Sequence, residues 1–213
     1  MKLNVEVRFE DLELGNPNRL IVAVEKEPLP LSFNVEVGAH LNTLRSSLDI
    51  LATALAHRYG IAKPNEVYFP VVRSEAVFLG GDYKGSKLVK GLPPAERALI
   101  EELKPYKGGN DRLWWLHDLD IVRKHRGLLA AEITPASIGI SGFGIRDHFV
   151  PVSSGWMRAD DKTVLGFWPR GRAEPKVDFT PYVAIIDGAF VESAVPALDK
   201  FARLAASIIN LFN

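Results

Sequence analysis

The sequence predicts an α+β fold, with about four helices, one of them central and buried, packed with antiparallel β-strands from the N-terminal and C-terminal segments. Polar and apolar residues alternate near the N-terminus and again after residue 127, which is typical of half-buried strands. Between these regions, and at the C-terminus, apolar residues recur every three or four positions, which indicates helices. Because the chain has no internal repeat and no low-complexity linker, we expect a single α+β domain over residues 1–213.

The overall composition excludes several functional classes. The 26 basic and 26 acidic residues give a formal net charge of zero, so the chain as a whole is not attracted to nucleic acid or to anionic membranes. The absence of cysteine excludes disulfides and thiolate chemistry and removes the usual structural zinc ligands. No apolar run approaches membrane-spanning length, and the first residues lack a signal-peptide core. We therefore expect a cytoplasmic protein without a membrane partner.

The N-terminal segment has the pattern of a small antiparallel sheet. Apolar residues alternate from Leu3 to Phe9, a turn follows at residues 15–18, and an apolar run begins at Leu20. Pro28 and Pro30 break that run, and a second alternation covers residues 31–37. Each of these three stretches is expected to be a strand.

From Gly38 the pattern changes to that of a helix, which we expect to end near Tyr59, before Gly60. Its apolar stripe consists of five leucines: Leu41, Leu44, Leu48, Leu51 and Leu55. Arg45 and Asp49 are four residues apart on the flank of this stripe. We expect them to contact the central helix through Asp120, Lys124 or His125.

The remaining elements follow in order. Residues 67–81 are expected to be short extended pieces, residues 81–87 a polar loop, and Pro93–Pro94 the start of a short helix that ends at Pro105. Five strand-like stretches come after Gly127, and a turn at Asp187–Gly188 leads into the last helix. The apolar stripe of that helix is wide enough to pack on a sheet or on a second copy of the chain, and so predicts a homodimer; it consists of Leu198, Phe201, Ala205, Ile208 and Phe212.

The central helix is predicted over residues 110–127. Asn110 or Asp111 can cap its N-terminus, cations lie in its last turn, and Gly127 allows the chain to leave it. Its apolar residues point in nearly every direction, so the helix is expected to be buried. Leu113, His117, Asp120 and Lys124 form one ladder along it.

Charges on a buried helix need partners, because an unpaired buried charge is too costly. The first interpretation is a structural interhelical network of ion pairs and hydrogen bonds, made of Arg45, Asp49, Asp120, Lys124 and His125. The second interpretation is an active site. If the network is structural, the protein is a non-catalytic binding or assembly protein.

Two segments resemble a widespread, largely uncharacterised bacterial family, whose members pair a helix of the type NLRSALDHL with a later helix of the type LWxLHxLDxxxKHR. Here the first motif matches TLRSSLDIL at residues 43–51, and the second matches residues 113–126 of the central helix. The chain departs from the pattern at Ile50, where a histidine is common, and at Arg123, where an acid is common. The resemblance implies a bacterial α+β protein and supplies no activity.

Arg112 and His117 are also similar to the Arg–His motif of the HEPN superfamily, whose members cleave RNA without metal. The two residues have four others between them and lie near the start of the helix. A histidine can act as general acid or base while an arginine stabilises the charge on phosphorus. The resemblance implies a ribonuclease with Arg112 and His117 as catalytic residues and RNA as substrate. Since the two side chains point about 140° apart around one helix, a dimer would complete the site.

LHDLD at residues 116–120 resembles the metal-binding helix of HD-type phosphohydrolases, in which a His–Asp doublet binds a divalent metal. Such a site would need further ligands, for which His40 or His57 and Asp147 or Asp187 are candidates without distinctive spacing. We expect no tightly bound metal and no cofactor. Glycines at 139–144 indicate a hairpin or bulge, and Trp156 and Trp168 are expected in the core, with base stacking as the alternative.

Overall fold

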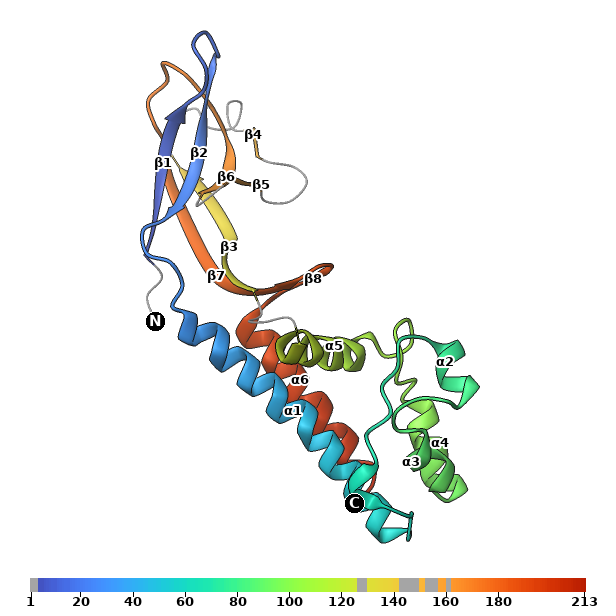
Figure 1. The fold of residues 1–213 in the computed structure, drawn as a ribbon. Helices are drawn as coiled ribbons and strands as arrows, with labels where there is room; N and C mark the ends of the chain where they lie inside the picture. Colours follow the sequence, from blue (N-terminus) through green and yellow to red (C-terminus); the bar gives the residue numbers. More distant parts are fainter. Residues whose placement is uncertain (1–3, 126–129, 142–149, 152–156, 160–161) are drawn as a thin grey trace. The chain divides into compact units, whose positions relative to one another are not determined.

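The computed structural model describes residues 4–125, 130–141, 150–151, 157–159 and 162–213 (Figure 1). It is α+β, as predicted, with six α-helices and antiparallel sheets in the described part. Contacts group the chain into a first unit, Met1–Pro30 with Ala131–Ala184, and a second unit, Leu31–Ala130 with Ile185–Asn213. The expected single-domain organisation stays a prediction.

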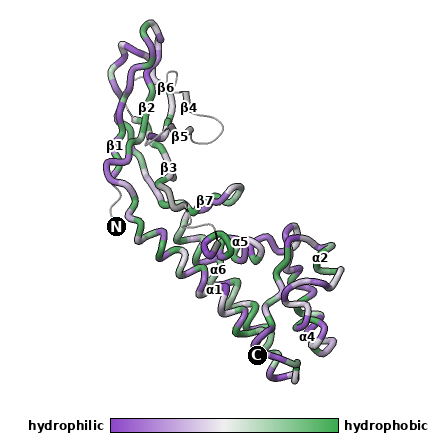
Figure 2. The backbone as a smooth tube through the Cα atoms, viewed as in Figure 1, coloured by the Kyte–Doolittle hydropathy of each residue, from purple (hydrophilic) through white to green (hydrophobic). Residues whose placement is uncertain are grey.

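The first unit contains a sheet of five strands. Its order is β1 (Val5–Asp11), β2 (Asn18–Glu25), β6 (Lys162–Pro169) and β4 (Val150–Pro151), with β5 (Met157–Ala159) also paired to β6. The pairings of β1 with β2 and of β2 with β6 are antiparallel, as the alternation predicted. Most of β2 is hydrophobic (Figure 2), and its residues 21–24 are buried on both faces of the sheet.

A second sheet has the order β3 (Ala130–Ser141), β7 (Lys176–Asp187), β8 (Phe190–Ser193). Within the first unit, Ile138 of β3 and Phe179 of β7 pack against Ile21 and Trp168, so the two sheets share one core. Trp168 is 3% exposed and belongs to that core. Trp156 and residues 142–144 of the glycine-rich stretch lie outside the described residues.

The second unit is mainly helical. Its elements are α1 (Leu31–Arg58), the 3-10 helix η1 (Pro64–Glu66), α2 (Glu75–Gly80), α3 (Ser86–Gly91), α4 (Pro94–Glu102), α5 (Asp111–His125), β8 and α6 (Ala194–Asn210). Helix α1 packs against both α5 and α6 (Figure 1). The central helix α5 buries Leu113, Leu116 and Leu119 completely.

Helix α1 corrects one strand prediction. Residues 31–37, expected as a strand, form its first two turns. Leu31 and Val35 are 71% and 54% exposed, so two of the alternating apolar residues are not core residues at all. The buried stripe begins at Val37 and continues to Leu41, a helical spacing that extends the predicted helix toward the N-terminus.

Residues 75–80, also expected as extended, form helix α2 instead. Ser74 caps its N-terminus, where its Oγ accepts a hydrogen bond from the Val77 N–H at 3.4 Å. Gly81 ends the helix with a left-handed backbone. Part of the predicted polar loop is likewise helical, as α3.

Helix α6 follows the short strand β8 rather than the turn at residues 187–188 directly. Its stripe is buried within the second unit, since Phe201, Ala205 and Ile208 are at most 3% exposed. Arg58 of α1 donates to the Phe212 carbonyl at 2.7 Å and ties the C-terminal end to the same helix. In the part of the chain that the structure describes, no helix combines the length and apolar character needed to cross a membrane.

Candidate ligand-binding site

The candidate site is built on helices α1 and α5. Asn110 caps α5, because its Oδ1 accepts the Leu113 N–H at 3.1 Å, one of the two caps that the sequence predicted. Asp111 Oδ1 instead accepts the Gly108 N–H at 2.7 Å and holds the preceding turn. The side chain of His125, and all of residues 126–127, lie outside what the structure describes.

Arg45 is the buried centre of the site. It lies within the buried stripe of α1, between Leu41 and Leu48, and is only 5% exposed. Its guanidinium donates three hydrogen bonds to three different residues: Nε to Nδ1 of His117 at 3.1 Å, Nη1 to Oδ1 of Asp49 at 2.8 Å, and Nη2 to the Phe69 carbonyl at 3.1 Å. These bonds satisfy a charge that could not otherwise be buried.

Asp49 connects the same network to the chain before α2. Its Oδ1 accepts the Phe69 N–H at 2.9 Å in addition to the bond from Arg45. Both backbone groups of Phe69 are therefore held by one ion pair on α1. This arrangement fixes an extended segment that has no ladder partner at Phe69 among the described strands.

Asp120 of α5 is a second buried charge, at 2% exposed. Its Oδ2 accepts from Lys124 Nζ, and its Oδ1 accepts from Arg123 Nη2 at 3.2 Å. Gly38 of α1 makes room for Arg123, since a Cβ atom at Gly38 would lie 2.6 Å from Arg123 Cδ. The two cations offset the cost of burying the carboxylate.

These side chains surround a cavity of about 320 Å³. Arg45 and Asp49 line it from α1, and His117, Asp120 and Lys124 line it from α5. Tyr68 and Lys84 complete the wall, with Lys84 Nζ 3.8 Å from the centroid of the Tyr68 ring. The ladder of His117, Asp120 and Lys124 inferred from helical spacing thus faces one space.

His117 is neutral in this site. Burial and, after it, the neighbouring Arg45 guanidinium lower the pKa of His117 from 6.5 to about 4. Because Arg45 only donates, Nδ1 must carry the lone pair, which places the ring proton on Nε2. Among the residues that the structure describes, Nε2 has no hydrogen-bond partner, so it remains available to a ligand.

The network differs from the predicted one in its central contact. Arg45 does reach the central helix, but through His117; among the described side chains it makes no bond to Asp120 or Lys124. Arg112 is engaged elsewhere: its Nη1 lies 2.7 Å from Glu192 Oε1, and its guanidinium carbon lies 5.6 Å from the Phe201 ring centroid. The structure therefore does not place Arg112 in the cavity that His117 lines.

The histidines nominated with His117 as metal ligands are dispersed. His40 and His57 are exposed on α1, and neither lines the cavity. Asp187 ends β7, and Asp147 lies outside the described residues. Among the described residues, no group of three or more acidic or histidine side chains has the arrangement of a metal site.

Sequence reasoning missed Tyr68, Lys84 and the backbone of Phe69. A backbone carbonyl carries no sequence signal. The contact of Lys84 with Tyr68 joins residues that are distant in the sequence, so it is visible only in the folded chain. Comparison with protein-family models, with curated proteins and with solved structures gives no match. The resemblances noted in the sequence therefore stay predictions.

Proposed function

We propose that this chain is a non-catalytic binding protein whose cavity between α1 and α5 takes a small ligand with a phosphate or carboxylate group. The observation that supports this is the balance of charge. Arg45, Lys84 and Lys124 contribute three cations to the lining, against the two carboxylates of Asp49 and Asp120. With His117 neutral, the lining carries an excess positive charge.

The hydrogen-bonding capacity of the cavity has the same bias. Both oxygens of Asp120 and one oxygen of Asp49 already accept hydrogen bonds within the protein. The free groups include donors: His117 Nε2–H and the ammonium protons of Lys84 that do not face Tyr68. Donors that have no acceptor within the protein suit an anionic ligand.

The lowered pKa of His117 favours binding over catalysis. A general base or acid works best when its pKa lies near the working pH. With a pKa of about 4, His117 is too weak a base and is not protonated to act as an acid at neutral pH. Its bond from Arg45 also occupies one ring nitrogen, as in a structural histidine.

Isothermal titration calorimetry in EDTA tests the proposal with inorganic phosphate, citrate and adenosine monophosphate, and with uncharged adenosine as the control ligand. At least one anion should bind, and its affinity should fall as salt rises. Lys84→Gln should weaken that binding about tenfold. Lys84 is the residue to change because, among the described residues, its ammonium makes no hydrogen bond or ion pair and lies only over the Tyr68 ring, so the fold should tolerate its loss.

The matched control is Lys87→Gln, since Lys87 is exposed, pairs with Glu66 and does not line the cavity. Lys87→Gln should bind as the wild type does. If none of the anions gives saturable binding at millimolar concentration, or if Lys84→Gln binds as tightly as the wild type, the anion site is wrong.

A metal-independent ribonuclease that uses Arg112 and His117 is the second candidate. The observation in its favour is that His117 presents Nε2 to a cavity. Purified protein would then cleave single-stranded RNA in EDTA, and either Arg112→Ala or His117→Ala would abolish cleavage while the chain stays folded. Intact RNA after prolonged incubation with a folded wild type would exclude this function.

We further propose a cytoplasmic location and self-association as a homodimer. The stripe of α6 is used inside the protomer, so a dimer would use other apolar side chains, such as the exposed Ile50 of α1. Sedimentation equilibrium of the wild type and of Ile50→Glu tests this. A monomeric wild type at micromolar concentration would exclude the dimer.

A further inference from the structure

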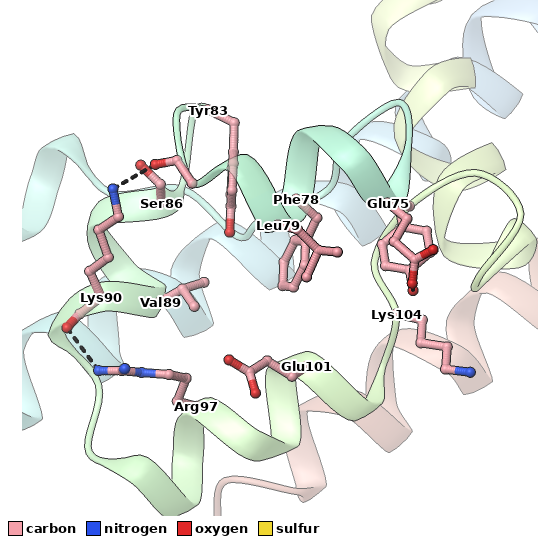
Figure 3. A pocket seen from close by; sticks show the side chains of 12 residues that line it. Glu75, Phe78, Leu79, Tyr83, Ser86, Val89, Lys90, Arg97, Glu101 and Lys104 are labelled. Carbon is pink, nitrogen blue, oxygen red and sulfur yellow. Dashed lines mark hydrogen bonds between the residues drawn. The ribbon is translucent and has the colours of Figure 1, made fainter.

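A larger cavity, of about 440 Å³, lies elsewhere in the second unit (Figure 3). It is built entirely from residues 75–106, and none of its lining residues belongs to the anion site described above. Its volume falls at the small end of the range for small-molecule pockets, roughly 300–1,000 Å³. It therefore fits a metabolite rather than a folded partner.

One wall of this cavity is aromatic. Phe78 stacks on Tyr83 with ring centroids 5.5 Å apart, and the Tyr106 ring is tilted against Phe78 at 5.9 Å. The Tyr106 hydroxyl donates to Glu75 Oε1 at 2.8 Å, so that carboxylate already has a partner. Val89 also points into the space (Figure 3). The wall can hold an apolar or aromatic group.

The opposite wall carries two charges that do not meet. Arg97 and Glu101 are four residues apart on α4, the spacing at which helical ion pairs form. Instead, Arg97 Nη2 donates to the carbonyls of Lys90 and Leu92, both at 3.1 Å. Among the described residues, the Glu101 carboxylate makes no hydrogen bond or ion pair, and Arg97 Nε is buried without an acceptor.

We propose that this cavity binds a free α-amino acid with an apolar side chain. The ammonium of the ligand pairs with the Glu101 carboxylate, and its carboxylate pairs with the Arg97 guanidinium. The side chain of the ligand lies against Phe78 and Tyr83. The two protein charges are already held apart and face one cavity, so a zwitterion satisfies both at once. This inference does not depend on the anion site.

The lining has three cations against two carboxylates, as the anion site does, but here the Glu101 carboxylate has no hydrogen bond or ion pair among the described residues, and this favours a zwitterion over a simple anion. Glu75 and Glu101 oppose a purely anionic ligand, and Lys90, Arg97 and Lys104 oppose a purely cationic one. Tyr83 adds a donor: burial and then the Glu101 charge raise the pKa of Tyr83 to about 12, so its hydroxyl keeps its proton at neutral pH. That hydroxyl points into the cavity (Figure 3) and can donate to the ligand carboxylate.

Calorimetry with three matched ligands tests the proposal: L-phenylalanine, phenethylamine, which lacks the carboxylate, and 3-phenylpropionate, which lacks the ammonium. L-Leucine serves as a smaller zwitterion. L-Phenylalanine or L-leucine should bind. If L-phenylalanine binds, phenethylamine and 3-phenylpropionate should each bind at least about tenfold more weakly than it does. Glu101→Gln should weaken zwitterion binding about tenfold but should not weaken binding of 3-phenylpropionate, because it removes a carboxylate that opposes an anion.

The control variant is Glu102→Gln, which changes the next residue on α4, exposed and outside the lining. It should bind like the wild type, and thermal melting should show both variants folded, because neither carboxylate makes a hydrogen bond or ion pair with another described side chain. The proposal is overturned if neither zwitterion binds at millimolar concentration. It is equally overturned if phenethylamine binds as well as L-phenylalanine, or if Glu101→Gln binds zwitterions as tightly as the wild type.

Discussion

Arg45 Nε donates to His117 Nδ1 across 3.1 Å, and this single bond joins two helices whose residues are 72 positions apart in the sequence. An arginine keeps its charge at every accessible pH, so it can bond to the ring only while Nδ1 is unprotonated. The bond therefore selects one tautomer and one charge state of His117. The same guanidinium also holds Asp49 and the Phe69 backbone.

Stability should fall as pH falls from 6.5 to 4. Unfolded His117 takes up a proton near pH 6.5, whereas folded His117, whose pKa is lowered chiefly by burial, takes it up only near pH 4. In that window the unfolded state binds more protons, so acid favours unfolding by an amount on the order of 3 kcal/mol. Urea denaturation at pH 7 and at pH 4.5 measures the loss.

The variant His117→Asn keeps an acceptor near Nδ1 and removes the titration. Its stability should vary less with pH over this window than that of the wild type. His57→Asn, at an exposed position of α1, is the control and should keep the wild-type pH dependence. Equal pH dependence in wild type and His117→Asn would show that His117 is not the group responsible.

Asp49→Ala should cost about 2–4 kcal/mol of unfolding free energy, because it leaves the buried Arg45 without its carboxylate and the Phe69 N–H without an acceptor. Chemical denaturation measures the change. For comparison, Lys63→Ala breaks the exposed pair with Glu66 and should cost less than about 0.5 kcal/mol. If Asp49→Ala costs no more than Lys63→Ala, the Arg45–Asp49 pair is a surface contact in solution.

Arg112 and Glu192 should be energetically coupled. Their 2.7 Å ion pair is about two-thirds shielded from solvent on both sides, so a double-mutant cycle with alanine should give about 0.5–1.5 kcal/mol of coupling. The Glu192 carboxylate also pairs with Lys200 at 3.2 Å, a more exposed partner whose coupling should be smaller. If the coupling energy is zero, the ion pair with Glu192 does not hold Arg112 in solution, and its guanidinium is available for a role in catalysis.

Gly85→Ala should destabilise the protein more than Gly15→Ala. Both glycines have left-handed backbones, at φ +100° and +93°, and alanine there costs about 1–2 kcal/mol in each case. At Gly85 a Cβ would also lie 2.8 Å from the Tyr68 carbonyl oxygen, whereas at Gly15 it would meet nothing within 4 Å. Thermal melting of both variants isolates the clash, and equal losses would contradict the packing at Gly85.

The sequence predicted the helices and strands whose apolar residues recur at a regular spacing. The helical period predicted α1, α5 and α6, and the prolines at 93 and 94 predicted the start of α4. Alternation predicted β1, and the apolar run from Leu20 predicted β2. It failed at residues 31–37, where exposed Leu31 and Val35 imitate the alternation of a strand. It failed again at α2, although the Ser74 cap and the Gly81 exit were both present as signals.

The site was predictable only within one helix. Spacing along α5 placed His117, Asp120 and Lys124 on one face, and they do line one cavity. The partner of Arg45 could not be chosen by spacing, because it depends on how α1 crosses α5. The sequence predicted Arg45 beside the apolar stripe, whereas the residue lies within the buried stripe of α1. Its charge can be buried there because the guanidinium donates three hydrogen bonds.

Tyr83 and Lys84 are consecutive residues, yet Tyr83 lines the larger cavity and Lys84 lines the smaller one. They belong to one short turn between Gly81 and Gly85, which rests on the backbone at Tyr68 and Pro70. A ligand that shifts this turn from one side changes the wall of the other site as well. Thermodynamic linkage then requires the effect to be mutual: whatever factor the amino acid imposes on the anion's affinity, the anion imposes on the amino acid's.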